Sequence, residues 1–213
     1  SYKVEGDLRS FYIDYYTDDF LLYDHITQVI STPNAPITSD CSVWFADKTT
    51  KSITTTGGRV FDLTYDPEYD LFIYELNGFV YFDNVKMDDI SLTVQTKTDI
   101  RNKILCTIEQ REGKGFLCIY SYSKNKTITK LKEFECNDPA DYRYATFDSI
   151  HHKLYMRELL SGISNYLGGG YIDFSDLDNI EHVTSDSFDN DPVYKVYYYD
   201  VIDEIVIETR TDS

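Results

Sequence analysis

Apolar and polar residues alternate along residues 61–82, and turn-forming residues interrupt the alternation twice. Pro67, set among acidic residues, marks the first turn, and Asn77-Gly78 marks the second. Alternation with a period of two is typical of a strand that buries one face. An Asn-Gly pair between such segments is the strongest short signal for a hairpin. The pattern therefore predicts three short antiparallel strands in this stretch.

A similar unit recurs along the chain, and in each copy an Asp precedes a large apolar residue by six positions. The recurring residues are Asp14, Asp66, Asp99, Asp148 and Asp200. Their spacing of 33 to 52 residues indicates a propeller, a solenoid or an array. Each complete unit offers about four short strands joined by polar turns, and the sequence shows no crossover helix of the kind that parallel sheets need.

We therefore expect an all-β, β-propeller-like fold with about four four-stranded antiparallel blades. The chain is expected to form a single domain, with repeats at approximately 8–56, 57–97, 98–138 and 139–190 and a partial repeat at 191–213. Because the last repeat has only two strands, the chain either closes as a small propeller or belongs to a larger one that supplies the remaining blades. It begins at Ser1 without a signal-peptide pattern, so we expect a mature or excised segment.

Two stretches carry a resemblance to known repeats. They are residues 148–158, Asp-Ser-Ile-His-His-Lys-Leu-Tyr-Met-Arg-Glu, and residues 66–75, Asp-Pro-Glu-Tyr-Asp-Leu-Phe-Ile-Tyr-Glu. Both resemble the blades of YWTD-type and NHL-type β-propellers, which implies a four-stranded blade in each repeat. No repeat contains the full Tyr-Trp-Thr-Asp motif, and the only Trp, Trp44, lies on a different expected strand.

Composition narrows the classes of partner. The net charge of −17 repels phosphate backbones, so we expect no nucleic-acid partner, and it disfavours anionic membrane surfaces. No apolar run is long enough to span a bilayer, so we expect no membrane insertion. The charge is compatible with cationic partners and with Ca²⁺, and it also serves simply to keep a β-rich surface soluble.

The cysteines lack metal-ligand spacing and are compatible with disulfides; they are Cys41, Cys106, Cys118 and Cys136. Antiparallel pairing about residue 112 would place Cys106 opposite Cys118, so we predict that these two are neighbours and are bridged if the protein is secreted. Cys41 and Cys136 would then pair separately or stay free. Asn125 begins the only N-glycosylation sequon. Together these features predict a secreted or cell-surface glycoprotein.

The acidic and histidine residues each allow a functional and a structural interpretation. The periodic Asp residues would form a ring of Ca²⁺-binding carboxylates or, as we favour, would cap the turns between strands. Asp176 and Asp178 are weak candidates for a Ca²⁺ site, against a solvated turn. The adjacent His151 and His152 would point to opposite faces of a strand, so all four histidines are interpreted as turn or surface residues rather than metal ligands.

The sequence predicts a non-catalytic scaffold that binds a protein or glycan partner through blade loops and needs no cofactor. The insertions Ser31–Asp40 and Leu159–Gly168 are expected to contact that partner, since long loops on a β scaffold often carry recognition. Two alternatives remain open: a Ca²⁺-dependent hydrolase or lactonase built on a propeller, and a structural subunit of a larger assembly. The sequence shows no nucleophile-elbow motif, and we assign no catalytic residues.

Overall fold

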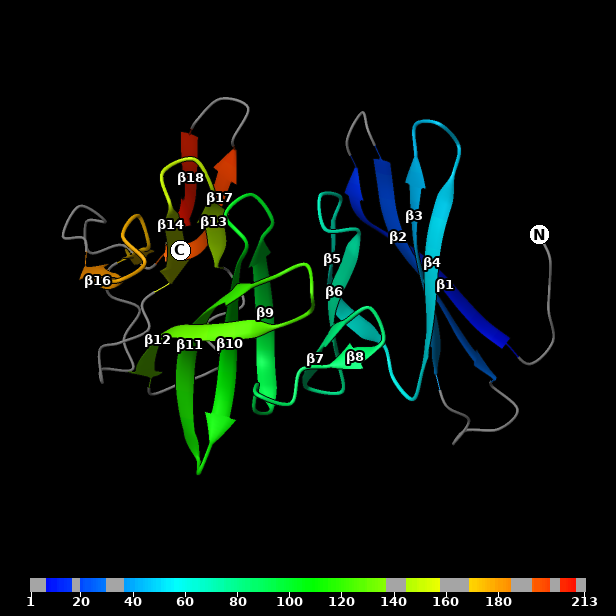
Figure 1. Ribbon diagram of the computed structural model, residues 1–213, viewed down its shortest axis with the longest axis horizontal. Coiled ribbons are helices and arrows are strands. Elements are labelled where there is room, and N and C mark those ends of the chain that lie inside the picture. The colour runs from blue at the N-terminus through cyan, green and yellow to red at the C-terminus, as the bar shows by residue number, and fades with distance from the viewer. Residues whose placement is uncertain are drawn as a thin grey trace. The chain divides into compact units, whose positions relative to one another are not determined.

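The computed structural model describes residues 7–16, 20–29, 37–136, 145–157, 169–184, 193–199 and 204–209. These residues form strands, turns and bends, and no helix. They build four four-stranded antiparallel sheets and one two-stranded sheet (Figure 1). The predicted all-β fold with four-stranded antiparallel units is confirmed for this part of the chain. Nothing in it forms a helix with the length and apolarity needed to span a bilayer.

Each four-stranded sheet is a meander in which consecutive strands pair. The first sheet comprises β1 (Asp7–Tyr16), β2 (Phe20–Val29), β3 (Thr38–Phe45) and β4 (Thr50–Thr56). The second comprises β5 (Val60–Asp66), β6 (Leu71–Leu76), β7 (Phe79–Phe82) and β8 (Val85–Lys86).

The third sheet comprises β9 (Thr93–Asp99), β10 (Ile104–Arg111), β11 (Lys114–Tyr122) and β12 (Ile128–Cys136). The fourth comprises β13 (Thr146–Asp148), β14 (Lys153–Arg157), β15 (Gly169–Asp173) and β16 (Glu181–Thr184). Strands β17 (Val193–Tyr199) and β18 (Glu204–Thr209) form the two-stranded sheet.

The strands at the junction of the second and third sheets differ from the expected ones. The strand Thr93–Asp99, which the expected boundary near residue 97 divides between two repeats, is the first strand of the third sheet. The fourth strand of the second sheet is the two-residue β8, and residues 90–94 do not extend that sheet. The buried Met87 and Ile90 lie in the connection between the two sheets, so its apolar residues resemble those of a strand in sequence.

The Asn77-Gly78 hairpin is confirmed. Strand β6 pairs with β7 from Leu76 opposite Phe79, which leaves two residues in the turn. Asn77 and Gly78 have φ values of 54° and 78°, the left-handed conformations that a type I′ turn requires. Asn tolerates this region better than most residues, and Gly occupies it without steric cost.

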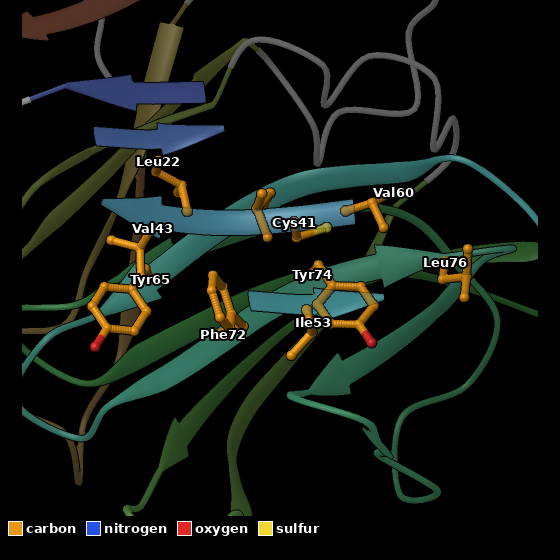
Figure 2. Packing of buried hydrophobic residues seen from close by; sticks show 10 residues of the cluster. Leu22, Cys41, Val43, Ile53, Val60, Tyr65, Phe72, Tyr74 and Leu76 are labelled. Atoms are coloured by element: carbon orange, nitrogen blue, oxygen red, sulfur yellow. The ribbon is translucent and has the colours of Figure 1, made fainter. Parts of the chain in front are cut away.

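The chain divides into two compact units, residues 1–88 and 89–213. In the first unit, the inner faces of the first two sheets form one apolar cluster (Figure 2). Cys41 and Val43 of β3 pack in this cluster with Phe72 and Tyr74 of β6. Burial of such side chains removes apolar surface from water and supplies the main favourable term for packing sheet on sheet.

The second unit has its own core between the third and fourth sheets. The apolar face of β10, with Ile104, Cys106 and Ile108, packs in one cluster with Leu154 of β14 and Ile172 of β15. These β10 residues alternate along the strand, so their neighbours Leu105, Thr107 and Glu109 belong to the opposite face, where they too are buried.

Candidate functional site: turns at the ends of the sheets

Three of the periodic carboxylates cap turns. Asp66, Asp99 and Asp148 each end the first strand of a sheet and are buried. In each case Oδ1 accepts hydrogen bonds from the backbone N–H groups two and three residues later, at 2.9 to 3.2 Å. The capping interpretation is therefore confirmed for these three residues.

The three capped turns share one backbone conformation. Each contains four residues, and the fourth has a left-handed φ of 54°, 58° or 56° at Asp70, Lys103 and His152 respectively. Repetition of both the cap and the left-handed residue shows that the sequence repeat encodes a turn geometry.

The pairing register shows that the Asp repeat does not extend to the other two sheets. In the second, third and fourth sheets, the last residue of the first strand is Asp66, Asp99 or Asp148, and each pairs with a residue five positions later, on the second strand. In the first sheet the corresponding residue is Tyr16, which pairs with Leu21, and in the two-stranded sheet it is Tyr199, which pairs with Glu204. Asp14 lies instead at a β-bulge in β1, and Asp200 lies outside the described residues.

Two histidines occupy the β13–β14 turn, as predicted. His151 places Nδ1 at 2.8 Å from Oδ2 of Asp148, and the His152 ring contacts the ring of Phe174 edge-on, with centroids 5.9 Å apart. His182 lies on strand β16, and the side chain of His25 lies outside the description. Among the described residues, no group of three or more His, Cys, Asp or Glu side chains could hold a metal ion.

Asp176 and Asp178 lie in the exposed connection between β15 and β16. Oδ1 of Asp176 accepts a hydrogen bond from the backbone N–H of Asp178 at 3.0 Å. Asp173, at the end of β15, caps Ser175 in the same way. These carboxylates therefore stabilise a solvated turn, which is the interpretation that the sequence favoured.

The predicted disulfide between Cys106 and Cys118 is wrong. Strands β10 and β11 do pair, but the register places Cys106 opposite Ile119 and Cys118 opposite Thr107. Side chains of directly opposed residues share a face, so these two cysteines point to opposite faces of the sheet. Cys106, Cys118 and Cys41 are buried and are not disulfide-bonded, and the side chain of Cys136 is not described.

The remaining sequence candidates divide between the turns and the undescribed segments. Asn125 is exposed in the β11–β12 turn, where an oligosaccharide would have access, and its glycosylation stays a prediction. The insertions Ser31–Asp40 and Leu159–Gly168 are the loops expected to contact the partner. Residues 31–36 and 159–168 lie outside the described residues, so that expectation stays a prediction.

Four turns of the second unit lie at one end of its two larger sheets, and we name them the turn rim: residues 100–103, 123–127, 149–152 and 174–180. In a meander the first and third connections lie at the same end, because consecutive strands run in opposite directions. Nδ2 of Asn102 donates to the carbonyl of Ser149 at 2.8 Å, which joins a turn of the third sheet to a turn of the fourth. The backbone N–H of Phe174 donates to the carbonyl of His152 at 2.9 Å.

The turn rim exposes both charged and apolar side chains. Arg101 and Lys124 are exposed on the third sheet, and Asp176 and Asp178 are exposed on the fourth. Ile150 and Leu177 are large apolar residues with 41% and 46% of their surface exposed. Exposed turns that combine charged and apolar side chains are a common setting for molecular recognition.

A buried polar network that the sequence did not reveal lies toward the opposite end of the third sheet, near the β10–β11 turn. Glu109 is 1% exposed, and its carboxylate accepts hydrogen bonds from Tyr120 Oη, from Thr107 Oγ1 at 3.0 Å and from the Ser91 backbone N–H at 3.2 Å. Nε of Arg111 lies 3.7 Å from the same carboxylate. The signal in the sequence was the pair Thr107 and Glu109, two residues apart and therefore on one face of a strand.

The network holds Glu109 in its charged form. Burial opposes ionisation of Glu109, but hydrogen bonds from Tyr120, Cys118 and Thr107 outweigh it and lower the pKa of the carboxyl. Burial, followed by the charge of Glu109, raises the pKa of the Cys118 thiol. A thiol with a raised pKa is a poor nucleophile at neutral pH.

Comparisons with known proteins place this chain in no family. No protein-family model matches the sequence, and no curated protein matches it. One solved structure, a crystal structure of the eukaryotic initiation factor, aligns with 85% of this chain at 11% identity and a TM-score of 0.37. This chain covers 53% of that protein, about half its length, and similarity at this level carries no argument about fold or function.

Proposed function

We propose that this chain is a non-catalytic binding scaffold, built from β-propeller-type blades, that recognises a protein or glycan partner through turns at the ends of its sheets. The observation that carries the proposal is the succession of four-stranded meanders, each packed through an apolar face within its unit. Propeller blades are four-stranded meanders of this kind, and a rigid β scaffold commonly presents its binding residues on connecting turns.

The capped turns support the resemblance to YWTD-type and NHL-type blades. The two stretches that carry this resemblance, residues 66–75 and 148–158, both begin with an Asp that caps a four-residue turn. The third sheet repeats the turn at Asp99 without the rest of the sequence pattern. Closure into a small propeller, or completion by further blades, is part of this proposal.

A Ca²⁺-dependent hydrolase and a structural subunit are the alternatives. The hydrolase needs carboxylates directed at a shared metal, whereas Asp66, Asp99 and Asp148 each direct one oxygen at two backbone N–H groups. The structural subunit would use the same exposed side chains in a permanent interface. Exposed Ile150 and Leu177 on the turn rim favour a protein-contacting surface over the hydrolase.

Secretion or display on a cell surface belongs to the same proposal. Its support is the exposed sequon residue Asn125, since the predicted bridge between Cys106 and Cys118 no longer supports an oxidising compartment. Expression through a secretory pathway, followed by treatment with an amidase that removes N-linked glycans, tests this part. A mass decrease at Asn125 supports secretion, and an unmodified Asn125 in secreted material counts against glycosylation.

Binding itself can be tested with immobilised panels of short peptides and of oligosaccharides. A ligand from either panel should bind the folded chain and lose affinity when an exposed turn residue is replaced, without a change in melting temperature. Leu177→Ser and Ile150→Ser are suitable turn variants, and Lys114→Gln, at the opposite end of the third sheet, is a matched surface control. The proposal fails if neither panel yields a ligand, or if no turn variant alters its binding.

A further inference from the structure

Basic residues are concentrated in the third sheet. Residues 93–136 contain nine of the 20 Lys and Arg residues of the chain but only five of its 37 Asp and Glu residues. This segment therefore has a formal charge of +4, against −17 for the whole chain, so the remaining residues carry −21. Such separation creates a local potential that attracts anionic groups to one part of an otherwise acidic molecule.

Several cations on the strands of this sheet already have anionic partners. Arg111 and Lys130 both contact Glu133, and Lys114 contacts Glu135. The two turns at the other end, residues 100–103 and 123–127, contain four Lys and Arg residues and no Asp or Glu, and the neighbouring Asp99 is buried with both of its oxygens bonded within its turn. The surplus positive charge of the sheet therefore lies on its turns.

Exposed basic residues of the third sheet lie close together on the turn rim. Arg101 lies in the β9–β10 turn and Lys124 in the β11–β12 turn, and Lys103 and Lys126 add charge to the same turns. The backbone N–H of Tyr122 donates to the carbonyl of Lys103 at 3.0 Å, which fixes one turn against the strand that enters the other. Arg101 and Lys124 are thus presented from one hydrogen-bonded end of the sheet.

Apolar side chains lie on the neighbouring turns. The Asn102–Ser149 hydrogen bond joins the basic β9–β10 turn to the turn that exposes Ile150. The Phe174–His152 bond then joins that turn to the segment that exposes Leu177. The surface therefore runs from a basic part to an apolar part within one unit.

From this arrangement we infer that the turn rim binds a short acidic peptide segment, its carboxylates on Arg101 and Lys124 and its apolar side chains on Ile150 and Leu177. This inference rests on the proposed function and names its partner as a protein. A long polyanion fits less well, because the rim continues into the exposed Asp176 and Asp178. Repulsion reaches about 8 Å at physiological salt, so each further phosphate or sulfate near these carboxylates weakens binding.

The experiment uses fluorescence anisotropy with labelled synthetic probes and the full chain. The main probe is a short peptide of Glu and Leu; the comparison probes are a Lys and Leu peptide, a Glu-only peptide, an oligouridylate and a sulfated oligosaccharide. The Glu and Leu peptide should bind most tightly, and its affinity should fall as salt rises from about 50 to 200 mM. The Glu-only peptide should bind more weakly, since it cannot use the apolar turns.

The variants separate the two parts of the surface. Arg101→Gln with Lys124→Gln should weaken the Glu and Leu peptide by about tenfold or more and remove most of the salt dependence. Leu177→Ser should weaken that peptide and leave the Glu-only peptide unchanged. The matched control, Lys48→Gln with Lys86→Gln, makes the same change of net charge in the first unit and should have no effect.

Three outcomes overturn the inference: no binding of the Glu and Leu peptide, equal loss in the control variant, or tighter binding of the oligouridylate or sulfated oligosaccharide. The broader function is judged separately. If the panels yield a ligand that responds to another turn, such as residues 46–49, while the Glu and Leu peptide does not bind, the scaffold function stands and this inference fails. Unchanged melting temperatures in all variants are required for either conclusion.

Discussion

The hydroxyl of Tyr120 donates a hydrogen bond to the carboxylate of Glu109 across the paired residues Thr107 and Cys118. Both Tyr120 and Glu109 are almost completely buried. A buried carboxylate is costly unless its oxygens accept hydrogen bonds. The carboxylate of Glu109 accepts hydrogen bonds from donors that include Tyr120, Thr107 and the Ser91 backbone. The network therefore links β10, β11 and the segment before β9 in the second unit.

Replacing Tyr120 by Phe should destabilise the chain by about 1 to 3 kcal/mol, because the ring remains while Glu109 loses a donor. Urea unfolding measured by fluorescence gives the difference. Tyr171→Phe is the matched control in the same unit and should change stability by less than about 0.5 kcal/mol. Equal effects of the two substitutions would show that the Tyr120 hydroxyl contributes nothing specific.

Stability should also depend on pH through Glu109. Its pKa is lowered in the folded state, so its contribution is fully present above the usual value of 4.5 and is lost as pH falls through the folded value below it. The wild type should therefore lose more stability below about pH 4.5 than Glu109→Gln does. Urea midpoints measured at a series of pH values test this, and parallel pH profiles would contradict it.

The turn caps give a second prediction. Asp99→Ala removes the acceptor for the backbone N–H groups of Arg101 and Asn102 and should cost about 1 to 2 kcal/mol. Asp99→Asn keeps one oxygen and should cost less. Asp176→Ala, in an exposed turn, is the control and should cost less than about 0.5 kcal/mol. If Asp99→Ala and Asp176→Ala cost the same, the buried caps have no special role.

The turn before β5 gives a third prediction. A Cβ added at Gly58 would collide with Oδ1 of Asn77 and lie 3.0 Å from its Cγ, and Asn77 is held by a 3.2 Å hydrogen bond from Nδ2 to the carbonyl of Gly57. Gly58→Ala should therefore cost about 0.5 to 1.5 kcal/mol. In an Asn77→Gly background, whose left-handed φ suits glycine, the same substitution should cost much less. Additive effects in this double-mutant cycle would rule out the collision.

The cysteines give a fourth prediction. Cys41, Cys106 and Cys118 should react slowly with a thiol reagent in the native chain and rapidly after denaturation, because all three are buried thiols outside any disulfide. Burial also raises the pKa of Cys118, which lowers its thiolate fraction further. Mass mapping without reductant should find no peptide that links Cys106 to Cys118. Such a link would require a register different from the observed one.

Local chemistry explains which elements the sequence could predict. Asn77-Gly78 specifies its own hairpin, because only certain residues adopt two consecutive left-handed conformations. Asp66, Asp99 and Asp148 could be predicted as caps, because Asp accepts hydrogen bonds from backbone groups two and three residues away. In both cases the determining interactions lie within a few residues along the chain.

Register and long-range contacts explain what the sequence could not predict. The Glu112-Gly113 turn contains two residues, so Arg111 pairs with Lys114 and every later pair is shifted by one from the expected register. A shift of one residue exchanges the faces of a strand, which is why Cys106 and Cys118 point apart. The turn rim depends on the contact of Asn102 with Ser149, 47 residues later, for which the sequence carries no local signal.

Calcium gives the last prediction. A Ca²⁺-dependent propeller enzyme would bind the ion through carboxylates with free oxygens, but one oxygen of Asp66, Asp99 and Asp148 already accepts two backbone hydrogen bonds. Millimolar Ca²⁺ should therefore leave the melting temperature unchanged, and lactone and ester substrates should not turn over. Tight binding would instead raise the melting temperature by several degrees. Mg²⁺ at equal concentration controls for ionic strength. A Ca²⁺-specific rise that Asp66→Asn, Asp99→Asn and Asp148→Asn abolish, together with hydrolysis, would replace the scaffold by the enzyme.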